Sequence, residues 1–344
     1  TNSVELDSNG LNFQGNSDVY EVKYTTNGQS VNLIYSDATQ GWIPLEDDVV
    51  ADEPVQPPTQ KAIFGYGKTS SDVSLTNLVN SSGVVATDVT GVGTARNNLA
   101  ASSYGGDKAI FGYGRTSTQV SMTNLVNNSG VVATDVSGVG TARQSLAAAS
   151  YGGDKAIFGY GTDSSLTNLV TNQGVVGNDV SGVGTARNDL AAASYGGDKA
   201  IFGYGYYYSG GVVNYSLTNK VSNSGVVASD TTGVGTARYL LAAAGYGGDK
   251  AIFGFGTTGS VTGLTNLVSN TGVVAANVSA VGTARKGLAA AGYGGDKAIF
   301  GYGTTGSLTA ITNLVNSSGV VASDVSGVGT AREKLAAAGF SYSA

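Results

Sequence analysis

Six near-identical copies of one segment fill most of this chain and constrain its fold more than any other feature. The string KAIFGYG, which reads KAIFGFG in the fifth copy, recurs at spacings of 47, 47, 44, 51 and 47 residues. The copies start at Lys61, Lys108, Lys155, Lys199, Lys250 and Lys297. A period of 40–50 residues with strand-like segments is typical of β-propeller blades.

Each copy contains four short apolar segments separated by turn residues. In one copy these read LAAAS, KAIFGYG, SMTNLV and VVATDV, with YGGD and NNSG among the turns. Apolar segments bounded by Gly, Asn and Asp predict short antiparallel strands. LAAAS contains good helix formers, but five residues are too few to nucleate a helix. The sequence therefore predicts an all-β fold made of four-stranded antiparallel blades.

The two ends of the array predict how it closes. The first copy begins at Lys61 with no LAAAS-YGGD before it, whereas residues 335–344 supply one extra strand, LAAAGF, after the last copy. Pairing that strand with the first copy would satisfy both free edges. We therefore expect residues 61–344 to form a closed six-bladed β-propeller, with residues 335–344 as the closing strand.

Length variation among the copies is confined to one connection. The loops that follow KAIFGYG contain 7, 7, 4, 11, 7 and 7 residues, and these differences account for every departure from the 47-residue period. In a four-stranded blade this loop lies on the same face as the blade-to-blade connection. The sequence thus predicts one variable face and one constant face, which carries the YGGD and NSSG turns.

A change of composition near residue 60 marks a domain boundary. Residues 1–60 hold ten acids and one base, whereas residues 61–344 have a net charge of +3. All four prolines precede residue 60, so residues 46–60 are predicted to be an acidic, Pro-rich linker. Residues 1–45 are predicted to form a small β module that anchors the propeller, with DVYEVKY and QSVNLIY as strands around an Asn27-Gly28 turn.

The absence of Cys and His removes most of the usual catalytic chemistry. Thiol nucleophiles, the common zinc sites and the Ser-His-Asp triad all require one of these residues. Each YGGD turn offers one carboxylate, which falls well short of the 6–8 oxygen ligands of Ca²⁺. Asp163, alone in the short third loop, is not expected to form a site. We therefore predict no enzyme activity, no metal and no cofactor.

A ring of arginines is the most regular charged feature. Its members are Arg96, Arg143, Arg187, Arg238, Arg285 and Arg332. One interpretation is a positive collar that binds a sulfated or carboxylated glycan. The other is a structural ring, in which each Arg pairs with an aspartate of its own or a neighbouring blade: Asp88, Asp135, Asp179, Asp230 or Asp324, with Asn277 in the fifth copy. The structural interpretation is favoured because a residue repeated in every blade usually serves the blade.

One loop occurs only once and is the candidate binding site. The fourth copy carries YYYSGGVVNYS, which contains Tyr206, Tyr207, Tyr208 and Tyr215. Tyrosine rings flanked by Gly and Ser suit sugar stacking and protein interfaces alike. The alternative is that this loop packs on its neighbours or on the acidic N-terminal module.

The order of motifs resembles kelch-type propellers. TARQSLAAAS-YGGD-KAIFGYG places an Arg, a small apolar strand, a Gly-Gly turn and a hydrophobic strand in the kelch order, although GYG replaces the usual diglycine and the outer-strand Trp is absent. The regular GTAR/KAIFGYG repeat and the segment YEVKYTTNGQSVNLIYSDATQGWIPLEDDV also resemble virion structural proteins of tailed bacteriophages, especially marine ones.

This resemblance implies a non-enzymatic tail-fibre, spike or capsid-decorating protein located in the virion. Expected partners are other virion proteins or further copies of the chain, bound through the N-terminal module, and a host-surface glycan or protein. Neither nucleic-acid binding nor membrane insertion is expected. The alternative is a secreted or cell-surface bacterial lectin or adhesin that binds glycans through its inter-strand loops.

Overall fold

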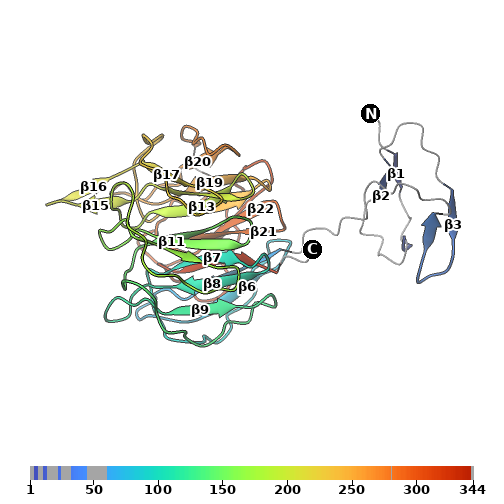
Figure 1. Ribbon diagram of the computed structural model, residues 1–344, viewed down its shortest axis with the longest axis horizontal. Helices are drawn as coiled ribbons and strands as arrows, with labels where there is room; N and C mark the ends of the chain where they lie inside the picture. Colours follow the sequence, from blue (N-terminus) through green and yellow to red (C-terminus); the bar gives the residue numbers. More distant parts are fainter. Residues whose placement is uncertain are drawn as a thin grey trace. The chain divides into compact units, whose positions relative to one another are not determined.

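The chain forms two compact units, Thr1–Pro58 with Ala344 and Thr59–Ser343. The computed structural model describes residues 4–6, 11–13, 22–24, 32–44, 60–279 and 281–341. All regular secondary structure in these residues is β-strand, which confirms the predicted all-β class (Figure 1). Within the same residues, no helix is long and apolar enough to cross a membrane.

The described part of the larger unit contains six three-stranded antiparallel sheets and one two-stranded hairpin. Their first strands are β24 (Ala336–Phe340), β7 (Ala100–Tyr104), β10 (Ala147–Tyr151), β13 (Ala191–Tyr195), β18 (Ala242–Tyr246) and β21 (Ala289–Tyr293). Their second strands are β5 (Lys61–Gly65), β8 (Lys108–Gly112), β11 (Lys155–Gly159), β14 (Lys199–Gly203), β19 (Lys250–Gly254) and β22 (Lys297–Gly301). Their third strands are β6 (Thr76–Val79), β9 (Thr123–Val126), β12 (Thr167–Val170), β17 (Thr218–Val221), β20 (Thr265–Val268) and β23 (Thr312–Val315).

The C-terminal strand pairs with the first copy of the repeat, as predicted. β24 lies antiparallel to β5, with Ala336 opposite Gly65 and Phe340 opposite Lys61. The same register joins β7 to β8 and the other first and second strands. The first sheet is therefore completed by residues from the far end of the chain.

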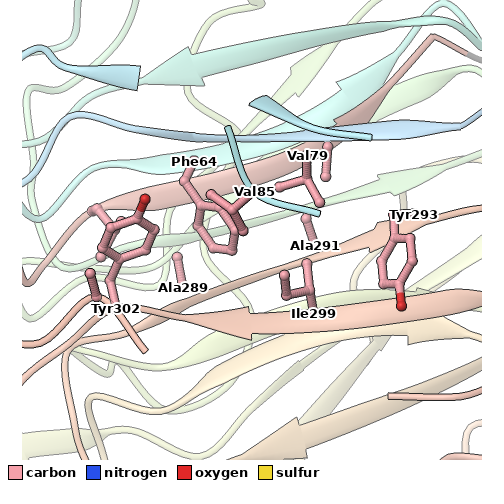
Figure 2. Packing of buried hydrophobic residues seen from close by; sticks show 11 residues of the cluster. Phe64, Val79, Val85, Ala289, Ala291, Tyr293, Ile299 and Tyr302 are labelled. Atoms are coloured by element: carbon pink, nitrogen blue, oxygen red, sulfur yellow. The ribbon is translucent and has the colours of Figure 1, made fainter. Parts of the chain in front are cut away.

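The core lies between adjacent sheets, because the second strands are buried on both faces. Ala, Ile and Phe of every KAIFG are inaccessible to solvent. Phe64 contacts Tyr302 of the neighbouring sheet edge-to-face, with ring centroids 5.2 Å apart (Figure 2). The last Gly of KAIFG makes this contact possible: a Cβ on Gly301 would lie 2.7 Å from Cζ of Phe64.

The predicted fourth strand does not form, so the four-stranded blade is wrong in this detail. In the first repeat the outer segment meets β6 only at two isolated bridges, Val79 with Val85 and Thr76 with Val89. Between these bridges the side chain of Asn77 donates to the carbonyl oxygen of Ala86 at 3.0 Å. The side-chain amide thus takes the place of backbone pairing, and the ladder is interrupted.

The N-terminal unit contains two short hairpin-like pairs among its described residues. β1 (Val4–Leu6) pairs with β2 (Val22–Tyr24), and β3 (Leu33–Tyr35) pairs with β4 (Trp42–Pro44). The predicted hairpin around the Asn27-Gly28 turn lies mostly outside the described residues, which show β2 paired with β1 and β3 paired with β4. Phe13 is buried and packs against Leu6, Leu33 and Trp42. Of the predicted linker, residues 46–59 also lie outside the described residues.

Candidate functional site

Each arginine of the predicted ring is fully buried where two repeats meet. Arg143 shows the arrangement: its Nε donates to the carbonyl oxygen of Tyr160 at 2.9 Å, and its Nη2 donates to Oδ1 of Asn168 at 2.5 Å. Both acceptors belong to the next repeat. On its other side the guanidinium lies over the ring of Tyr113, 4.6 Å from the centroid. A buried guanidinium has no surface to offer to an external anion, so this geometry disfavours the glycan-collar interpretation.

The ring aspartates are held mainly by threonine and asparagine. Asp179 accepts from the Thr141 hydroxyl at 2.6 Å and from the Asn168 amide at 2.9 Å, whereas Nη1 of Arg143 is 3.6 Å away. Burial alone would raise the pKa of Asp179, but these hydrogen bonds and the nearby guanidinium outweigh it and lower the pKa below 3.8. The aspartate therefore joins two repeats as a charged hydrogen-bond acceptor.

The junction between the fourth and fifth repeats lacks this carboxylate, because Asn277 takes its place. The substitution Asn277→Asp should raise the stability at pH 7 by about 1 kcal/mol, since it adds a charged acceptor near the buried Arg238 at a partly solvated site. The new carboxyl group should have a lowered pKa, like Asp179. The added stability is then fully present above the unfolded-state pKa of about 3.9, and it is lost as the pH falls through the lowered pKa of the folded state.

Thermal melts of wild type and Asn277→Asp between pH 7 and pH 2 check this expectation. The two curves should be separated at neutral pH and should converge in acid. A variant without added stability at pH 7, or a gain that persists at pH 2, contradicts the proposed electrostatic origin.

The tyrosine-rich loop forms a separate two-stranded hairpin that extends from the repeat sheets (Figure 1). β15 (Tyr206–Tyr208) pairs with β16 (Val212–Asn214), and Tyr208 lies opposite Val212. Tyr208 is 60% exposed, Val212 53% and Val213 44%. The other repeats have no such hairpin within the described residues, so this apolar surface is specific to the fourth repeat.

The structure separates the four candidate tyrosines. Tyr208 is exposed, whereas Tyr206, Tyr207 and Tyr215 are half-buried. Tyr206 stacks at a tilt on Tyr239, with ring centroids 4.9 Å apart. Burial raises the pKa of Tyr206, and the carboxylates of Asp189 and Asp163 act in the same direction. Tyr206 thus belongs to the base of the hairpin.

Sequence reasoning missed the residues around this base. Asp163, which was not expected to form a site, is bonded to Asn188: its carboxylate accepts from the side-chain amide at 2.6 Å. Asn188 in turn pairs through its backbone with Tyr206. A signal was present in the sequence, because the two positions after each GTAR vary although the surrounding residues are repeated: NN, QS, ND, YL, KG and EK.

The second of these variable positions forms a cyclic set, here called the neck ring. Its members are Asn98, Ser145, Asp189, Leu240, Gly287 and Lys334. Each backbone N–H donates to the carbonyl oxygen of the member before it, and Asn98 donates to Lys334, at 2.7–3.0 Å. The six residues line a cavity of about 90 Å³ together with the leucine that follows each of them. Burial raises the pKa of Asp189, against the opposing effects of Ser145 and Lys334.

Comparison with protein-family models gave no matching family, and no curated protein matches the chain. Among the described residues, no group of three or more acidic side chains lies close enough together to hold a metal ion.

Proposed function

We propose that this chain is a non-enzymatic structural component of a phage particle, a tail fibre, spike or decoration protein. In this proposal residues 61–344 form a closed six-bladed propeller that presents its variable loops to a partner, and the N-terminal unit attaches it to other virion proteins or to further copies. The resemblance of the GTAR/KAIFGYG repeat to phage virion proteins supplies the assignment to a virion.

Three cyclic sets of contacts support a closed propeller. The first is the neck ring. The second joins the YGGD turns, where the backbone N–H of Gly105 donates to Asp154 at 2.7 Å and the last such bond runs from Ser341 to Asp107. The third joins each GTAR threonine to the aspartate or asparagine of the next repeat, and Thr330 of the last repeat bonds Asp88 of the first at 2.5 Å. In each set the sixth contact joins the C-terminal end of the repeat array to its beginning.

The composition supports a binding role rather than catalysis. The chain has neither His nor Cys. The carboxylates of Asp163 and Asp189 act on Tyr206 at the hairpin base, and Asp163 is already engaged by Asn188. General acid–base chemistry needs a titrating group within hydrogen-bond reach of a bound substrate. Asp163 is instead arranged to position the hairpin.

The observation that carries the proposal is the exposed apolar surface of the β15–β16 hairpin. An isolated two-stranded hairpin is marginally stable in water. This one nevertheless exposes Tyr208, Val212 and Val213, which lie on both faces of the ribbon because neighbouring residues of a strand alternate. Aromatic anchors contribute strongly to binding when a partner buries them. We therefore assign the attachment surface to this hairpin.

Replacing the three exposed side chains tests this assignment. The variant Tyr208→Ser/Val212→Ser/Val213→Ser should lower the affinity for host cells or for the purified assembly at least about tenfold, because each buried anchor contributes on the order of 1 kcal/mol. Its melting temperature should change little. Tyr206 is left intact, since its contact with Tyr239 makes it a packing residue as well.

A matched control uses valines of similar exposure on the outer segments. Val84→Ser/Val131→Ser/Val175→Ser removes three side chains that are each about 60% exposed. This control should bind as wild type does. Equal binding by the hairpin variant and the control contradicts the assignment, as does a hairpin variant that loses binding only together with its fold.

The lectin alternative is favoured by the stacked pair Tyr206–Tyr239 beside Asp163. Aromatic rings next to carboxylates suit the apolar face and the hydroxyl groups of a sugar. Two measurements separate the proposals. Mass spectrometry of purified phage particles should detect the chain if it is a virion protein. Detection only among secreted bacterial proteins, together with specific binding on a glycan array, would favour the lectin.

A further inference from the structure

A polar cavity lies at the end of the repeat unit that carries the YGGD turns. Its volume is about 350 Å³. All six first strands contribute their next-to-last residue, so the cavity is bounded by every repeat sheet. These residues are Ser103, Ser150, Ser194, Gly245, Gly292 and Gly339. None of the lining residues belongs to the β15–β16 hairpin or to the neck ring.

One side of the cavity is polar, because the three serines lie on the first strands of three successive sheets. Oγ of Ser150 donates to Oγ of Ser194 at 3.2 Å, which leaves the proton of Ser194 directed elsewhere. A hydroxyl group both donates and accepts, so three of them in a row match the alternating donors and acceptors of a polyhydroxylated molecule.

The opposite side is formed by glycines and the side chain of Gln60. A Cβ on Gly339 would lie 2.7 Å from Nε2 of Gln60, so the glycine provides the space that the amide occupies. The backbone carbonyl of Gln60 accepts from Gly294 at 2.8 Å, which fixes the residue at the wall of the cavity. The amide thus adds one further donor and acceptor across from the serines.

The charges near the cavity cancel in pairs. Lys250 and Lys297 line it, and each ammonium group is 2.7 Å from the carboxylate of the preceding residue, Asp249 or Asp296. The two turns therefore direct no unpaired carboxylate or ammonium group at a ligand. The cavity is therefore suited to a neutral ligand.

Apolar side chains lie next to the serines, further along the first strands from the YGGD turns. In a strand, alternate residues share a face, so Ala148 follows Ser150 inward along β10. Alanines at this level of the six first strands line a further space of about 140 Å³. Methyl groups beneath a row of hydroxyls provide an apolar floor and a polar wall, the two surfaces that a sugar ring presents.

From this arrangement we infer that the cavity is a binding site for a small, neutral, polyhydroxylated molecule of the size of a monosaccharide. The serine hydroxyls and the Gln60 amide bind its hydroxyl groups, and the alanine methyls line the further space along the first strands. This site is separate from the attachment hairpin, because none of its lining residues belongs to β15 or β16.

Calorimetric titration of the full chain with free D-glucose, D-galactose and D-mannose tests the inference, with sodium sulfate as a charged comparison. At least one sugar should bind saturably with a Kd in the range of about 1–10 mM, as expected for a small ligand held by a few hydrogen bonds. Sulfate should not bind there. Absence of saturable binding by all three sugars, or preferential binding of sulfate, overturns the inference.

Two variants locate the site. Ser150→Ala/Ser194→Ala should weaken the sugar about tenfold without loss of fold, since alanine already occupies neighbouring positions of these strands. Gly245→Leu should abolish binding by filling the cavity; a Cβ at Gly245 has no neighbour closer than 3.5 Å, so it can be accommodated. The exposed serine variant Ser129→Ala is the matched control. Sugar binding that survives both cavity variants overturns the assignment.

The hairpin variant Tyr208→Ser/Val212→Ser/Val213→Ser separates this inference from the proposed function. It should bind the sugar as wild type does while it loses attachment. If the hairpin variant loses the sugar and Gly245→Leu retains it, the sugar binds at the hairpin and the cavity assignment is wrong.

Discussion

Deletion of residues 335–344 should abolish the cooperative fold of the repeat unit. The deletion removes β24, so that β5 loses its antiparallel partner along its whole length. It also removes Leu335 and Phe340, which are 5% and 2% exposed. Losing two large buried side chains costs on the order of 6–10 kcal/mol, which is comparable to the total stability of a typical domain. The free edge of β5 would in addition promote aggregation.

Size-exclusion chromatography and calorimetry of the truncated chain measure this effect. Removing only residues 342–344 is the matched control and should leave the melting temperature nearly unchanged. Adding a synthetic peptide of residues 335–344 should restore part of the soluble, folded material, because it supplies the missing strand. A truncated chain that stays monomeric and melts like wild type contradicts both the importance of the β24–β5 pairing and the closed ring that we propose.

Replacing a ring arginine by alanine should have the second largest effect. In Arg143→Ala the carbonyl oxygen of Tyr160 and the side-chain oxygen of Asn168 lose their donor in a buried place, and the ring of Tyr113 loses its cation. Breaking a buried charged network in this way costs about 3–5 kcal/mol. For a unit of this size the melting temperature should fall by roughly 10 °C.

Two further variants separate charge from geometry. Arg143→Lys keeps the charge but has a single ammonium group in place of the planar fork, so most of the loss should remain. Arg115→Ala is the matched control, because Arg115 is exposed and lies outside the ring. If Arg143→Ala melts at the temperature of Arg115→Ala, the buried network does not join the repeats in the way that its geometry indicates.

The sequence was sufficient for the elements that depend on local patterns. The length of KAIFG, its apolar run and the flanking Gly and Asp residues predict the second strand of every sheet. The missing LAAAS strand before Lys61 and its extra copy at the C-terminus predict the β24–β5 pairing. Composition separates residues 1–60 from the repeats, close to the boundary at Pro58. The strand predictions succeed because strand propensity and turn residues are properties of contiguous segments, and the β24–β5 pairing was predictable because the repeat shows which strand each end lacks or adds.

The side-chain contacts between repeats were decided by the tertiary structure alone. The aspartate that was expected to pair with each arginine is bonded mainly to a threonine of the preceding repeat, 41 residues away in the case of Thr94 and Asp135. The fourth strand is interrupted because Asn77 donates its side-chain amide to the backbone there. Side-chain direction at such places depends on neighbours that a local pattern does not specify.

For the candidate sites too, the sequence was sufficient for some residues and the tertiary structure decided the others. The repeat makes six positions equivalent in sequence, so only a departure from it can mark a specific site. The eleven-residue loop was such a departure and was found. The varied residues after each GTAR were another, but nothing local relates Asp163 to Asn188 or Asp189 to Lys334. Packing of the sheets brings them together, and the cavity beside Gln60 likewise exists only because six strands converge there.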